Sequence, residues 1–74
     1  MKLVSCSINS YKTTGERIMN VVLASDNTPS VLPTRGAGIE GLNSSDYFAP
    51  LSVLMVVSSG DVYLTNESGT FVKQ

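Results

Sequence analysis

Polar and apolar residues alternate over the first eleven residues of the chain. Val4, Cys6 and Ile8 fall on one side of an extended segment, and serine and asparagine side chains fall on the other. Alternation with a period of two is typical of a strand with one buried face. We therefore expect a half-buried strand over residues 2–11, with Cys6 as a small buried apolar side chain.

A second extended segment follows a turn over residues 12–15, which ends in Thr-Thr-Gly. Residues 16–24 are apolar on both faces apart from Asn20. A helix is conceivable here, but the adjacent β-branched Val21 and Val22 favour a strand. The two segments predict an antiparallel hairpin over residues 1–24.

Residues 25–50 differ in character, because all three prolines and three of the six glycines of the chain lie here. A connection of this length is uncommon in a compact domain and is usually functional. It nevertheless carries six large apolar side chains, which are Val31, Leu32, Ile39, Leu42, Tyr47 and Phe48. We expect an ordered loop that docks these side chains on a partner, the alternative being that it packs on its own sheet.

The last third of the chain predicts a three-stranded meander. Residues 51–57 are an almost unbroken apolar run, which is typical of a strand buried on both faces. Two turns that contain glycine, at residues 58–61 and 66–69, separate it from two further short strands. We expect Tyr63 and Phe71, on those last two strands, to form a cross-strand aromatic contact.

Together these segments predict an all-β fold, a small antiparallel sheet or barrel in a single domain over residues 1–74. Its parts are the hairpin (1–24), the ordered Pro/Gly-rich loop (25–50) and the β-meander (51–74). A domain of this size buries only about 60% of its unfolded surface, so it commonly needs a disulfide, a metal or a partner chain.

The composition indicates that self-association is the expected source of additional stability for this small domain. Cys6 is the only cysteine and histidine is absent, so we expect neither a disulfide within the chain nor a metal site. Charged residues make up 15% of the chain, against roughly 25% in typical globular proteins, so few charges keep copies apart. We expect a homo-oligomer, with a trimer as its form, assembled around Val53, Met55, Val57, Tyr63 and Phe71.

The candidate chemistry argues against an enzyme. Without histidine no Ser-His-Asp arrangement is possible, and the carboxylates fall mostly in the loop and turns. Residues 36–41 spell G-x-G-x-x-G, but a dinucleotide site needs a strand before this motif and a helix after it, and Pro33 and Asn43-Ser44-Ser45 flank it instead. We expect no cofactor.

The charge pattern also argues against two classes of partner. The net charge is −1 and the basic residues are scattered without an aromatic stripe, so we expect no nucleic-acid partner. The longest apolar run, residues 53–57, is far shorter than the roughly 20 residues of a membrane-spanning helix, so we expect no membrane partner.

Several short segments occur in an order that resembles a known family. They read VLASDNTP (22–29), LPTRGA (32–37), GL (41–42), FAPLSVL (48–54), VYL (62–64) and GTFVKQ (69–74). The ordered set resembles a family of short virion structural proteins of tailed bacteriophages, related to head-fibre or head-decoration proteins, over residues 20–74. The resemblance implies a β-rich, trimeric protein on or near the capsid, with no catalytic residues.

We therefore expect a capsid-decoration or head-fibre anchoring piece, made in the host cytoplasm and located in the virion, that docks on the major capsid protein or another virion protein. The expected contact residues are Val31, Leu32, Ile39, Leu42, Tyr47, Phe48, Val53, Met55 and Val57. Two alternatives stay open: a free-standing β module that binds a ligand such as a glycan, and a tail or baseplate component of the virion.

Overall fold

The computed structural model describes all 74 residues and contains six strands and no helix. The strands are β1 (Lys2–Tyr11), β2 (Arg17–Ser25), β3 (Tyr47–Phe48), β4 (Val53–Val56), β5 (Asp61–Thr65) and β6 (Phe71–Lys73). The predicted all-β class is confirmed. No segment forms a helix of the length and apolarity needed to cross a membrane.

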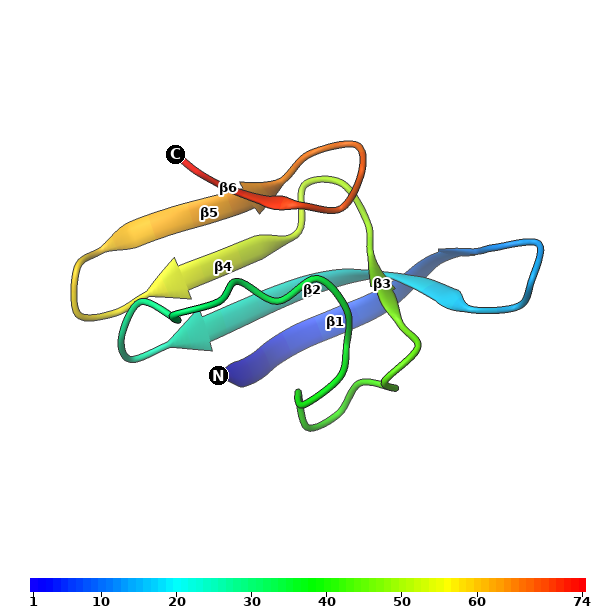
Figure 1. Cartoon of the computed structure of the whole chain (residues 1–74), viewed down its shortest axis with the longest axis horizontal. Coiled ribbons are helices and arrows are strands. Elements are labelled where there is room, and N and C mark those ends of the chain that lie inside the picture. Colours follow the sequence, from blue (N-terminus) through cyan, green and yellow to red (C-terminus); the bar gives the residue numbers. More distant parts are fainter.

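The strands form one open sheet in the order β1-β2-β4-β5-β6, and β3 pairs with the first part of β2 (Figure 1). β2 runs parallel to both β3 and β4, while the other pairs are antiparallel. The prediction of a purely antiparallel sheet or a barrel is therefore wrong. The parallel pairing arises because residues 26–46 carry the chain back to the start of β2 before β3 and β4 repeat its direction.

One face of the sheet carries the hydrophobic core. Its buried residues are Met19, Val21, Leu23, Ile39, Phe48, Leu54, Val56, Tyr63 and Phe71. The connection over residues 26–46 crosses this face, seen in green over the strands in Figure 1, and contributes Ile39 to the core, with Leu32 and Leu42 packed against it. We call this the core face.

The sequence predicted that residues 51–57 form a strand buried on both faces, and this prediction is wrong. β4 covers only Val53–Val56, and its side chains alternate between buried and accessible positions. Leu54 and Val56 point into the core, whereas Met55 is 39% exposed. Both faces of β4 are apolar, but the rest of the chain covers only the face that carries Leu54 and Val56.

The prediction of a half-buried N-terminal strand is wrong as well. β1 is exposed at nearly every position, and Cys6 is exposed rather than buried. Cys6 and Ile8 share register with Val21 and Met19 and so lie on the core-face side. Leu3 is the residue of β1 that packs against the core, and it lies beside Gly41 of the 26–46 connection, whereas Cys6 and Ile8 stay exposed.

The predicted aromatic contact between Tyr63 and Phe71 is replaced by another. The register pairs Phe71 with Thr65, and Tyr63 with Lys73. Phe71 packs edge-on against Phe48 instead, with ring centroids 5.2 Å apart and planes at 60°. The core thus joins β6 to the short β3 strand, a contact that local strand pairing does not reveal.

Candidate assembly surface

The strand register places a second set of apolar side chains on the face opposite the core. One row across four strands consists of Val22, Val53, Leu64 and Val72, which are successive register partners. A second row beside it consists of Ala24, Met55 and Val62. Residues paired across strands point to the same face of a sheet, so the two rows form one continuous apolar surface. We call these seven residues the open face.

No segment of the chain covers the open face. Met55, Val62 and Val72 are exposed, and the other four residues are half-buried by their neighbours in the sheet. On β1 the two rows continue as Ser5 and Lys2, so the apolar surface ends in polar side chains. An apolar patch of adjacent residues bordered by polar ones is typical of a protein–protein contact.

A tight turn between β3 and β4 adds an apolar projection beside this face. The N–H of Ser52 donates to the carbonyl of Ala49 at 3.3 Å, which closes a turn with Pro50 and Leu51 at its centre. Leu51 has φ 65°, the only positive φ outside glycine, and it is 75% exposed. It lines a shallow depression of about 290 Å³ together with Ser5, Cys6, Ser7, Asn20, Val21 and Val22.

Two buried hydroxyl groups hold this turn in place. The N–H of Ser52 donates to Oγ1 of Thr65 at 2.8 Å, and the N–H of Val21 donates to Oγ of Ser52 at 3.2 Å. Both hydroxyls donate to the carbonyl oxygen of Ala49, at 2.8 and 2.6 Å. Ser52 and Thr65 were not predicted to be structural residues, because nothing in the sequence distinguishes them from surface serine and threonine.

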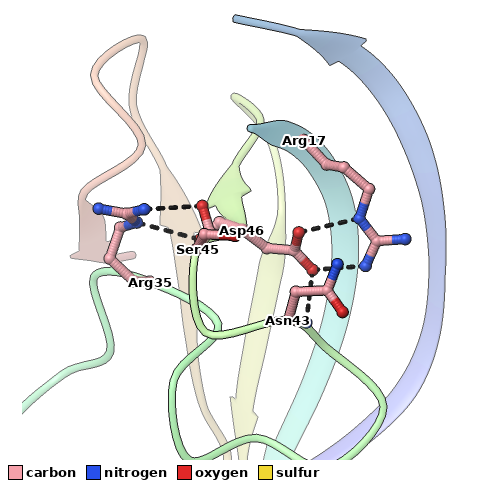
Figure 2. Close-up of polar contacts among 5 residues, drawn as sticks. All are labelled: Arg17, Arg35, Asn43, Ser45 and Asp46. Carbon is pink, nitrogen blue, oxygen red and sulfur yellow. Dashed lines mark hydrogen bonds and ion pairs between the residues drawn. The ribbon is translucent and has the colours of Figure 1, made fainter. Parts of the chain in front are cut away.

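A partly buried ion pair fixes the end of the 26–46 connection against β2 (Figure 2). Arg17 donates from Nε to Oδ1 of Asp46 at 2.9 Å and from Nη2 to Oδ2 at 2.6 Å. The N–H of Asn43 donates to Oδ2 at 2.8 Å, and the Asp46 side chain is fully buried. Arg35 donates to the carbonyl oxygens of Ser45 and Asp46. The group serves to position the chain, since every carboxylate oxygen is already occupied.

The same cluster accounts for the first glycine of the G-x-G-x-x-G segment. The N–H of Gly36 donates to the carbonyl of Asp46 at 3.0 Å. A Cβ at Gly36 would overlap the carbonyl oxygen of Asn43 and press on Leu42 and Asp46. The residues after the motif form turns and no helix, so in this fold the glycine permits close packing of the connection.

The ion pair predicts a stability change in acid. Hydrogen bonds from Arg17 hold the pKa of Asp46 below its ordinary value, and the same contact raises the pKa of Arg17. Because folding lowers the pKa of Asp46, its stabilisation is complete above the ordinary value of about 4 and is lost as the pH falls through the lower value of the folded state. We expect Asp46→Asn to cost about 1–3 kcal/mol at neutral pH, because the part-buried donors of Arg17 and Asn43 lose their charged acceptor.

Urea unfolding of both proteins between neutral pH and strong acid measures this. The difference between wild type and Asp46→Asn should shrink below about pH 4. Some acid dependence should remain in the variant, because a hydrogen bond from Thr14 also lowers the pKa of Glu16. A difference that stays constant down to strong acid would show that the Asp46 carboxylate does not stabilise the fold.

The largest hollow of the surface lies at the opposite end of β2 from the β4 pairing, and Tyr47 is its accessible aromatic residue. Nζ of Lys12 lies 3.9 Å from the centroid of the Tyr47 ring, and the guanidinium carbon of Arg35 lies 3.7 Å from it. Both cations therefore lie against the Tyr47 ring, and any ligand that stacked on the ring would compete with them.

The structure divides the nine predicted contact residues into two sets. Those drawn into the protein's own core face are Ile39 and Phe48, which are buried, and Leu32 and Leu42, which pack against them. Those left accessible are Val31, Val53, Met55 and Val57, together with the half-buried Tyr47, whose ring contacts two cations. Val53 and Met55 belong to the open face, and Val57 follows them in the same alternation.

Two residues expected in an intersubunit core lie elsewhere. Tyr63 and Phe71 are buried within the core of the single chain. Five residues of the open face were not predicted as members of an assembly surface: Val22, Ala24, Val62, Leu64 and Val72. The sequence does show that their strands are apolar on both faces, but only the strand register shows that these residues share one face.

Comparison with known proteins gives no relative. No family model matches the chain, and neither a curated protein nor a solved structure shows significant similarity to it. The candidate surface is therefore defined by geometry and by the sequence of this chain.

Proposed function

We propose that the chain is a structural assembly module that associates with copies of itself through the open face. The observation that supports this is the uncovered apolar surface across β2, β4, β5 and β6. Burial of apolar surface contributes about 25 cal/mol per Å². A sheet with one covered face and one bare apolar face therefore gains substantially when a second protein surface covers the bare one.

Low charge supports the same proposal. Lys2 is the only charged residue among the register partners of the two apolar rows, and it lies at their border on β1. Two copies can approach with these faces opposed without burying a charge, which is the usual obstacle to association.

The proposed setting is the virion of a tailed phage, where the module acts as a capsid-decoration or head-fibre anchoring piece. The support is the sequence resemblance, whose segments contain all of the open face except Met55, as well as the turn at Leu51. The resemblance implies a trimer. Of the 26–46 connection, Val31 is 80% exposed and is the apolar residue best placed to touch the major capsid protein.

Sedimentation equilibrium tests the assembly proposal. The purified chain at tens of micromolar should have a mass of two or more times 7.9 kDa, the mass of one copy. A well-folded particle of 7.9 kDa at that concentration would contradict self-association. The virion setting is tested separately by cosedimentation with purified heads of the phage that encodes the chain, where binding should saturate; the absence of saturable binding would contradict it.

A further inference from the structure

The turn at Leu51 holds an exposed apolar side chain in a strained backbone conformation. A positive φ at the third position of a turn is normally taken by glycine, because a Cβ is strained there. Leu51 has φ 65° and is three-quarters exposed, so burial within its own chain does not offset the strain. Strain that the core does not explain points to a role at the surface.

The turn is also rigid. The buried hydroxyls of Ser52 and Thr65 both donate to the Ala49 carbonyl, and the N–H of Leu51 donates to the carbonyl of Thr65 at 3.0 Å. These bonds fix the turn on both sides of the projecting side chain. An anchor that is already held in its bound conformation loses less entropy on association.

Leu51 lies directly beside a hollow on the same surface. The register pairs Ser5 with Val22 and Ser7 with Asn20, which places these four side chains on the open-face side of the sheet. All four line the depression that Leu51 borders. A projection and a hollow that adjoin on one surface are self-complementary about a two-fold axis, because each copy can offer its projection to the hollow of the other.

We propose that two copies pack open face against open face, and that Leu51 of each copy enters the depression between β1 and β2 of the other. This inference rests on the proposed self-association through the open face, and it specifies the contact as a two-fold pair in place of the trimer that the resemblance implies. A standard interface takes about 800 Å² from each partner, which is less than a fifth of the 4471 Å² of accessible surface of this chain. Opposed sheets lie about 10 Å apart, which leaves room for side chains from both.

Two substitutions at one position separate this role from a role in folding. Leu51→Gly removes the side chain and relieves the backbone strain. Leu51→Asn keeps a similar size and tolerates positive φ, but it replaces the apolar tip by a polar one. We expect both variants to melt, under dilute conditions where the chain is monomeric, at or above the temperature of wild type. We expect both to raise the dissociation constant of the pair by about 10- to 100-fold.

Sedimentation equilibrium over a range of concentrations measures these dissociation constants. Met55→Glu serves as the reference variant in which association through the open face is disrupted. Dissociation constants unchanged in both Leu51 variants, while Met55→Glu dissociates, would overturn the anchor and leave the proposed function standing. A trimer without detectable dimer would overturn the two-fold arrangement. Wild type that stays monomeric would overturn both proposals.

Discussion

Phe71→Ala is expected to destabilise the fold by about 3–5 kcal/mol, the range for removing a buried aromatic ring. Phe71 is 3% exposed and packs on Phe48, so it joins β6 to β3 across the core. A domain of this length has a total stability of roughly 4–11 kcal/mol. The substitution therefore removes a large part of the stability and should leave much of the protein unfolded at moderate temperature.

Urea unfolding followed by circular dichroism measures this change, and the adjacent residue supplies the control. Val72 is exposed on the open face, so Val72→Ala should cost less than about 1 kcal/mol when both variants are measured at concentrations where the chain is monomeric. A midpoint for Phe71→Ala equal to that of wild type would show that the ring contributes nothing to the core.

Met55→Glu should abolish association while leaving the monomer folded. Met55 lies in the open face between Ala24 and Val62 in the register, and it is accessible, so the monomer keeps the new carboxylate in water. In an assembly closed over this face the carboxylate would be buried without a partner, which is strongly unfavourable. We expect the dissociation constant to rise by more than about 100-fold.

Ile8→Glu is the matched control for that charge. Ile8 is 48% exposed, a value close to that of Met55, but it pairs with Met19 and so lies on the core-face side of the sheet. It should leave the mass in solution unchanged, and the spectra of both variants should match wild type. Equal loss of association in the two variants would point to net charge rather than to the open face.

Local pattern was enough to predict the class of fold, because strand and turn signals act over a few residues. The strand predicted over residues 16–24 corresponds to β2, and Gly15, Gly60 and Gly69 adopt positive φ in turns between paired strands. Glycine has no Cβ to oppose that conformation, so its position can be interpreted without a structure.

The parallel pairing of β2 with β4 could not be predicted in the same way. It joins Val22 to Val53, which lie 31 positions apart, and no local signal in the sequence shows where a connection of this length brings the chain back to the sheet. The lack of information on long-range pairing also explains why residues 51–57 were wrongly predicted to be buried on both faces. An unbroken apolar run fits a strand with two covered faces, but equally a strand with one covered and one bare face.

The buried polar contacts could not be predicted from the sequence either. Arg17 and Asp46 lie 29 positions apart and form a pair because β2 and the end of the connection meet. The turn at Leu51 separates β3 from β4, so the backbone groups of Ala49 and Val21 beside it lack strand partners. The hydroxyls of Ser52 and Thr65 supply those hydrogen bonds and are buried for that reason. Such roles depend on the backbone path, which sets where unsatisfied groups occur.

Oxidation of the three methionines tests the central claim most directly, because they report on three different environments in one chain. Met1 is exposed, Met19 is buried in the core and Met55 lies on the open face. Peroxide converts accessible methionine to the sulfoxide, and mass spectrometry of peptides measures each rate. At high protein concentration, assembly through the open face predicts that Met55 is protected like Met19 while Met1 reacts, and that dilution restores its reactivity. A Met55 that oxidises as fast as Met1 at every concentration would contradict assembly through the open face.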